Sequence, residues 1–132
     1  MKIILLVVII GAVAVGAFAC SKKNSSSTYQ NLNSDEFEKL IAGQDIQLLD
    51  VRTAEEYADS HLQNSTNIDV LQDSFAQKAS EGLKKELPVA VYCKSGRRSR
   101  NAADIFVKQG YKVYNLDSGI TGWIADDKPV VK

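Results

Sequence analysis

The sequence predicts an α/β fold, an open and mostly parallel sheet of about five strands with helices on both faces. Short apolar runs typical of buried strands alternate along the chain with amphipathic segments typical of helices. This alternation favours parallel strands joined by helical crossovers, and it places helices over both faces of the sheet. The expected strands are residues 46–51, 66–68, 88–92 and 112–116, with an edge strand at 128–131.

Helices are expected between these strands, and capping residues mark where two of them begin. Asn33 and Thr53 are N-cap residue types, and each is followed by a glutamate three positions later. The helices predicted on these signals run from 33 to 43 and from 53 to 60. Apolar residues at helical spacing predict two more helices, at 73–85 and 99–109, and a short segment with Ile120 and Trp123 follows the turn at 117–119.

The first 19 residues predict a signal peptide. Lys2 precedes a run, 3–19, without any charged or polar side chain, and the run ends in the small-residue pattern Ala17-Phe18-Ala19. As a helix the run is about 25 Å long, which is marginal for spanning a bilayer. A cleaved signal and an uncleaved anchor both fit the pattern. Either one delivers the rest of the chain outside the cytoplasm.

Cys20 directly follows this pattern and precedes a polar, serine-rich stretch. The arrangement resembles the bacterial lipoprotein signal, although Ala17 stands where leucine is usual. The resemblance implies that Cys20 carries lipid, that residues 20–32 form a flexible tether, and that the domain 33–132 is held at a membrane of the cell envelope, facing the periplasm or the exterior. The alternative is ordinary secretory cleavage, which leaves Cys20 as a free N-terminal cysteine.

Charge and cysteine content exclude several functions. The chain has 16 basic and 16 acidic residues, so no overall positive charge points to a nucleic acid partner. About 100 residues remain after the tether, enough for one small domain, which we expect to be monomeric. If Cys20 is acylated, Cys93 is the only free thiol. An internal disulfide, a CxxC redox motif and a cysteine-based zinc site are then excluded, and we expect neither a metal nor another cofactor.

The most informative segment is the turn Cys93-Lys94-Ser95-Gly96-Arg97-Arg98-Ser99, between a buried strand and a helix. Backbone N–H groups in such a turn, together with the helix N-terminus, stabilise negative charge. The same field of N–H groups lowers the pKa of a thiol, and four basic residues and no acid lie between 94 and 100. A buried inert cysteine beside a solvated basic helix face is the alternative, but an inert thiol has no use for four cations. Cys93 is therefore the candidate nucleophile, and the candidate anion-binding residues are Lys94, Ser95, Gly96, Arg97 and Arg98.

Asp50 and Arg52 end another predicted strand. Ligands of open α/β sheets bind beyond the carboxyl ends of the strands, so we expect these residues and Cys93 to face one pocket. An ion pair that braces the pocket is favoured over a catalytic role for Asp50 and Arg52.

From about residue 33 to 131 the chain resembles a single rhodanese-like sulfurtransferase domain. The matching pieces, in order, are Asp50-Val51-Arg52, Glu56-Tyr57, His61-Leu62, Asn67-Ile68, Cys93-x-x-Gly96-x-Arg98-Ser99, Leu116-Asp117-x-Gly119-Ile120 and Trp123. The resemblance implies ping-pong catalysis through a persulfide on Cys93. A small anionic donor such as thiosulfate supplies the sulfur, and cyanide or a thiol accepts it. It also implies that the amides of 94–98 hold the persulfide, that Lys94, Arg97 and Arg98 neutralise the donor, and that Arg98 alternatively folds the loop.

Departures from the family pattern lie around His61. Ser60 stands where glycine is usual, and Gln63-Asn64-Ser65 replaces Pro-Gly-Ala. We expect Asn64 to adopt the positive φ that the glycine would supply. The resemblance gives His61 a structural role, and we expect Trp123 to be a core or pocket-wall aromatic.

Three other functions stay open at this point. A cysteine phosphatase is disfavoured because its loop is one residue longer, whereas Cys93 to Arg98 spans six residues, and because no acid lies in the loop to protonate a leaving group. A persulfide carrier with little turnover of its own fits as well as an enzyme does. An interaction domain without catalysis would have no need of a thiol at position 93.

Overall fold

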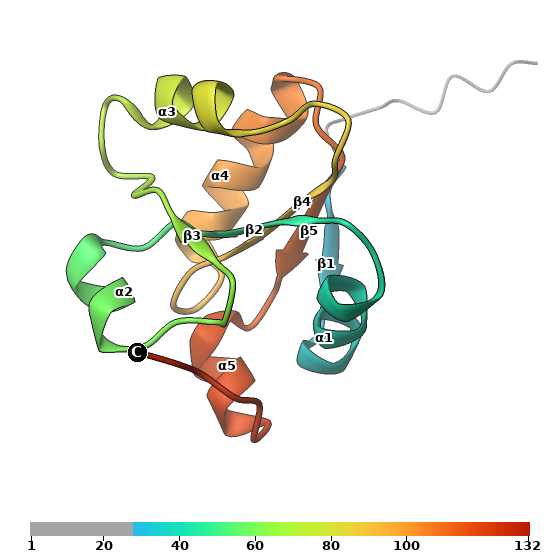
Figure 1. Cartoon of the computed structure of the whole chain (residues 1–132), viewed down its shortest axis with the longest axis vertical. Helices are drawn as coiled ribbons and strands as arrows, with labels where there is room; N and C mark the ends of the chain where they lie inside the picture. The colour runs from blue at the N-terminus through green and yellow to red at the C-terminus, as the bar shows by residue number, and fades with distance from the viewer. Residues whose placement is uncertain (1–27) are drawn as a thin grey trace, which may run out of the picture.

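The computed structural model describes residues 28–132, which form five strands and five helices (Figure 1). The strands are β1 Gln30–Leu32, β2 Gln47–Asp50, β3 Thr66–Asn67, β4 Val89–Tyr92 and β5 Val113–Leu116. The helices are α1 Ser34–Gly43, α2 Ala54–Asp59, α3 Phe75–Gly82, α4 Arg97–Lys108 and α5 Gly119–Ala125.

All strand pairs in the sheet are parallel, in the order β1-β5-β4-β2-β3. β4 lies at the centre, and each of its four residues is fully buried, as expected for a strand covered on both faces. The predicted fold class is therefore confirmed. Because Cys93 directly follows β4, the reactive residue lies at the middle of the carboxyl edge of the sheet.

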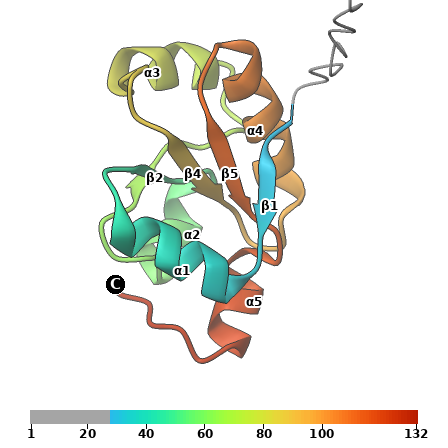
Figure 2. The same cartoon turned by 90° about the vertical axis from the view of Figure 1, so that its right-hand side faces the viewer.

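Helices lie over both faces of the sheet (Figure 2), and a hydrophobic cluster fills the space on each face. Leu49, Val91 and Cys93 belong to the cluster that contains Phe75 of α3 and Phe106 of α4. The other cluster joins sheet residues to helices α1 and α5, and its members include Phe37, Leu48, Tyr92 and Trp123. Successive side chains of β4 alternate between these clusters, as the pleat requires.

The fifth strand is not where the sequence placed it. Gln30–Leu32, assigned to the tether, forms the edge strand β1 and pairs with β5 in the register Asn31↔Asn115. The expected strand at 128–131 was wrong, because Val131 makes only an isolated antiparallel bridge with His61. Backbone pairing with β5 holds the polar β1, so no apolar pattern marked it.

Helix starts matter most for the site. Both predicted capping boxes are present: the Glu36 amide donates to Asn33 Oδ1 at 2.9 Å, and Thr53 and Glu56 cap α2 in the same way. α4 begins at Arg97 rather than at residue 99, because Gly96, with φ of 97°, occupies its N-cap position. Arg97 and Arg98 are therefore helical residues and not part of the loop.

The predicted signal peptide 1–19, the lipidation site Cys20 and residues 21–27 of the tether lie outside the described residues. Between residues 28 and 132, the helices are too short and too polar to cross a bilayer.

Candidate active site

The sulfur of Cys93 is buried and hydrogen-bonded within its own loop. Only 1% of the residue is exposed, and the Gly96 amide donates to Sγ at 3.1 Å. Burial raises the pKa of this thiol. Hydrogen bonds from the hydroxyl and amide of Ser99 and from the amides of Gly96 and Ser95 outweigh burial, so the pKa lies below its ordinary value. The geometry thus favours a thiolate.

Ser99 also belongs to this site, although its place in the motif Cys93-x-x-Gly96-x-Arg98-Ser99 gave it no role. Its buried hydroxyl also lies 3.1 Å from the Gly96 carbonyl oxygen. A hydroxyl has one proton, so Ser99 donates either to that carbonyl or to the sulfur, and an ionised sulfur is the stronger acceptor. Hydrogen-bond donors therefore lower the pKa of Cys93, as expected from the backbone N–H groups of the turn, and the Ser99 hydroxyl adds to them.

Backbone hydrogen bonds from the start of α5 hold the Cys93 loop in place. The Ile120 amide donates to the Cys93 carbonyl oxygen at 2.9 Å, and the Thr121 amide donates to that of Lys94 at 3.1 Å. A Cβ atom at Gly96 would collide with the Asp117 carbonyl oxygen, and one at Gly119 would collide with the Lys94 backbone. Both glycines also have positive φ, so these two positions require glycine.

Arg98 does not point its charge at an open substrate site. Its guanidinium donates to both carboxylate oxygens of Glu56, at 2.7 and 2.9 Å. This bond is the main reason why the pKa of Glu56 falls to about 2. The geometry supports the loop-folding role of Arg98 over donor binding. Glu56 stands in the matching piece Glu56-Tyr57 and in the capping box with Thr53, but neither signal assigned it to the site, because its contact with Arg98 joins distant parts of the chain.

The predicted ion pair between Asp50 and Arg52 is present, with a shortest N–O distance of 2.6 Å between two buried side chains. Arg52 also donates to the Ser60 carbonyl oxygen at 2.6 Å, and its guanidinium lies over the Tyr92 ring. The expected shared pocket with Cys93 was wrong. Asp50 is in register with Tyr92, whose side chain belongs to the α1 and α5 face, whereas Cys93 belongs to the α3 and α4 face.

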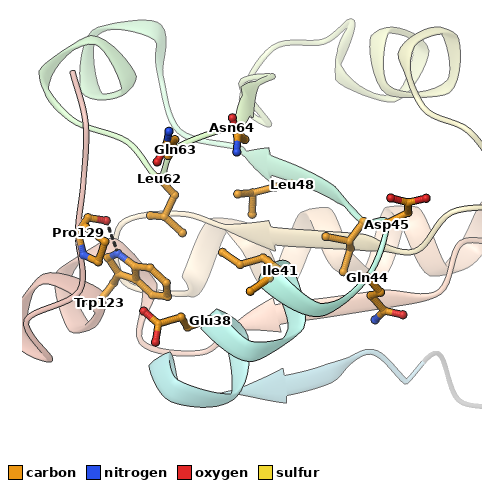
Figure 3. Close-up of a pocket in the computed structure, with 12 residues that line it drawn as sticks. Glu38, Ile41, Gln44, Asp45, Leu48, Leu62, Gln63, Asn64, Trp123 and Pro129 are labelled. Atoms are coloured by element: carbon orange, nitrogen blue, oxygen red, sulfur yellow. Dashed lines mark hydrogen bonds between the residues drawn. The ribbon is translucent and has the colours of Figure 1, made fainter.

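The remaining expectations around His61 are confirmed. His61 donates from Nδ1 to the Tyr57 carbonyl oxygen at 2.8 Å and stacks on the Tyr57 ring at 3.8 Å, which fits a structural role. Asn64 has φ of 66°. Trp123 is 3% exposed and donates from Nε1 to the Pro129 carbonyl oxygen, so it is both a core residue and a wall of the cavity in Figure 3.

The other candidates lie at the surface, in the loop or at the start of α4. Lys94, Ser95 and Arg97 are exposed, and Arg100 lies 4.0 Å from Asp117. Among residues 28–132, no three His, Cys, Asp or Glu side chains gather as metal ligands would. A cavity of about 250 Å³ beside Asn67 and Asp69 does not include the loop.

The model of the rhodanese-like domain family matches residues 33–126, which span the sheet from α1 to α5 and include the Cys93 loop. The chain belongs to the rhodanese-like family. This confirms the resemblance, and the match begins after β1, which the structure adds to the rhodanese-like domain.

Curated relatives of this rhodanese-like domain are named thiosulfate sulfurtransferase GlpE. The protein from Coxiella burnetii is 35% identical over 98 residues, 74% of this chain and 89% of the relative. The protein from Actinobacillus pleuropneumoniae is 31% identical over 106 residues, 80% of this chain and 95% of the relative.

Solved structures agree with the fold. A rhodanese-related protein from Thermoplasma volcanium superposes with a TM-score of 0.69 at 28% identity, over 78% of this chain and 98% of that chain. A rhodanese-like domain protein from Staphylococcus aureus gives 0.63 at 25% identity, over 71% and 90%. Since the Thermoplasma chain consists almost entirely of the matched part, a rhodanese-like domain of this extent folds without further segments.

Proposed function

We propose that this protein is a sulfurtransferase that moves sulfane sulfur from thiosulfate to a thiophilic acceptor through a persulfide on Cys93. The observation that carries the proposal is the Cys93 sulfur itself. The sulfur accepts a hydrogen bond from the Gly96 amide at 3.1 Å, and a set of hydrogen-bond donors lowers the pKa of the Cys93 thiol. Those donors stabilise an anion on Sγ, and both the thiolate and the persulfide are anions.

In the first half-reaction the Cys93 thiolate attacks the outer sulfur of thiosulfate. A bond forms between Sγ and this sulfur while the S–S bond of thiosulfate breaks, and its electron pair leaves with sulfite. Cys93 then carries Sγ–S⁻. No oxidant or proton donor is needed, because a thiolate and a dianion give a persulfide anion and a dianion.

In the second half-reaction the acceptor attacks the outer sulfur of the persulfide. Cyanide forms thiocyanate, and the electron pair of the broken S–S bond returns to Sγ as thiolate. A thiol acceptor becomes a persulfide in the same way. The donors around Sγ serve this step as well, because the leaving group is the thiolate that they stabilise.

Exposed cations support an anionic donor. Lys94 and Arg97 flank the loop, and Arg100 is 45% exposed on the next turn of α4. Arg98 is less suited to this role, because its guanidinium pairs with Glu56. The relatives named thiosulfate sulfurtransferase support thiosulfate as the sulfur donor, because the match to this chain covers most of the length of each relative.

The anchor is a second part of the proposal. The signal-like segment 1–19 and Cys20 support a lipid-anchored domain at the cell envelope that acts as a monomer. In a bacterial host, Cys20→Ala is expected to abolish membrane association of the processed protein. If the Cys20→Ala variant stays membrane-bound after cleavage, lipidation at Cys20 is contradicted.

Steady-state thiocyanate formation from thiosulfate and cyanide tests the enzyme against the carrier. Turnover that requires Cys93, and is lost in Cys93→Ser, supports the enzyme. One sulfur transferred per Cys93, followed by no further turnover with cyanide or small thiols, favours a persulfide carrier. Equal turnover in wild type and Cys93→Ser contradicts the mechanism.

A further inference from the structure

A cavity of about 380 Å³ lies on the sheet face opposite Cys93, between α1, α5 and the C-terminal segment (Figure 3). Its apolar wall includes Ile41, Leu48, Leu62 and Trp123, and the last three of these side chains are buried. The volume lies within the range of about 300–1,000 Å³ that small-molecule sites occupy. The mechanism proposed above makes no use of this cavity.

The polar residues of the cavity have one sign of charge. Glu38 and Asp45 line it together with amide side chains, and its twelve lining residues include no lysine, arginine or histidine. Glu38 is already bound by Lys128 Nζ at 3.0 Å, whereas Asp45 is exposed and makes no ion pair within residues 28–132. In Figure 3, Trp123 and Glu38 lie at one end of the cavity and Asp45 at the other.

We propose that this cavity binds a small organic cation, an amine or guanidine with an apolar body. The apolar body packs against Leu62 and Trp123, and the cationic group lies at the Asp45 end. Trp123 cannot add a hydrogen bond, because its Nε1–H is used by the Pro129 carbonyl oxygen. An anion such as thiosulfate is repelled by the carboxylate of Asp45, and the nearby cation, Lys128, is already paired with Glu38, so this site is distinct from that of the sulfur donor.

The sheet separates this site from the active site. Leu48 faces the cavity, and the next residue, Leu49, faces the cluster that contains Cys93. Cation binding is therefore expected to be independent of the Cys93 sulfur, and a Cys93→Ser variant should bind as wild type does. Failure of this proposal and failure of the sulfurtransferase proposal are thus distinguishable.

The test is a titration of residues 28–132 with phenethylamine, followed by fluorescence and by calorimetry. Trp123 is the only tryptophan of the chain, so its emission reports on the cavity alone. We expect saturable binding, with the neutral phenethyl alcohol weaker and the anionic phenylacetate weakest, by about five- to tenfold against the amine. Absence of saturable binding in both measurements, or equal binding of all three compounds, would overturn the proposal.

Matched variants locate the binding. Ala42 lines the cavity from the surface of α1, so Ala42→Leu narrows it and should weaken binding, whereas Ala76→Leu on the exposed side of α3 should not. Asp45→Asn should weaken the amine about two- to fivefold and leave the alcohol unchanged, with Asp73→Asn as the control. Unchanged amine binding in Ala42→Leu would place the compound elsewhere and contradict the proposal.

Discussion

Arg98 and Glu56 are joined by two hydrogen bonds of 2.7 and 2.9 Å, across 42 positions of the chain. The pair connects the first turn of α4, directly after the Cys93 loop, to the first turn of α2. Arg98 therefore acts as a positioning residue, because its ion pair with Glu56 holds the first turn of α4 close to the first turn of α2.

Loss of this pair should slow sulfur loading without removing the nucleophile. Glu56→Gln keeps the size of the side chain and loses its charge, so Arg98 is held less firmly. We expect kcat/KM for thiosulfate to fall about three- to tenfold. Glu55→Gln, an exposed neighbour in the same turn, is the matched control and should leave the rate unchanged. Equal rates in wild type and Glu56→Gln would show that the pair has no positioning role.

The same pair predicts how stability depends on pH. The pKa of Glu56 falls from 4.5 to about 2 on folding, so its contribution is complete above the unfolded value and is lost as pH falls through the folded value. We expect the wild type to lose about 1 kcal/mol of this contribution between pH 5 and 2, an amount reduced by solvent screening. In urea unfolding, the stability of Glu56→Gln relative to wild type should improve over that interval. A constant difference between the two would contradict this linkage.

The thiol should ionise below its ordinary range, and Ser99 should be responsible for part of the shift. Ser99→Ala removes the hydroxyl donor to Sγ and leaves burial unchanged, so the pKa of Cys93 rises. The rate of alkylation by iodoacetamide against pH measures this directly. Ser80→Ala, an exposed serine on α3, serves as the control. An identical alkylation profile in wild type and Ser99→Ala would remove the hydroxyl from the account.

Gly96 should tolerate no side chain. In Gly96→Ala the new Cβ meets the Asp117 carbonyl oxygen, and the residue must keep φ near 97°. We expect a loss of about 1–3 kcal/mol in the free energy of unfolding and a loss of activity beyond tenfold. Gly82→Ala is the control, since nothing lies within 4 Å of the position that its Cβ would occupy. Wild-type activity in Gly96→Ala would contradict the close contact between the loop and Asp117.

The parts of the fold that the sequence predicted are those with a local signal. β2, β4 and β5 are apolar runs, and Thr53 and Asn33 are helix caps within three residues of their partners. β1 has no such signal, because Gln30 and Asn31 are exposed polar residues held by pairing with β5. A strand that forms only through pairing with a neighbouring strand has no pattern of its own in the sequence.

The site shows the same division. Cys93 and Gly96 lie three residues apart, so their loop was predicted from its spacing. The pairing of Arg98 with Glu56 joins distant parts of the chain, and no local pattern predicts it. The sheet face on which Asp50 lies follows from its register with Tyr92, and this register is defined only in the assembled sheet. The sequence therefore predicted the nucleophile and the loop amides around it, but not the roles of Ser99 and Glu56.

The most direct test of the central claim is the intact mass of residues 28–132 after incubation with thiosulfate and removal of the excess. We expect wild type to gain the mass of one sulfur atom and to lose it again when cyanide is added, with one thiocyanate formed per sulfur lost. Cys93→Ser should gain nothing. A wild-type protein without the added sulfur, or the same adduct on Cys93→Ser, would contradict sulfur transfer through Cys93.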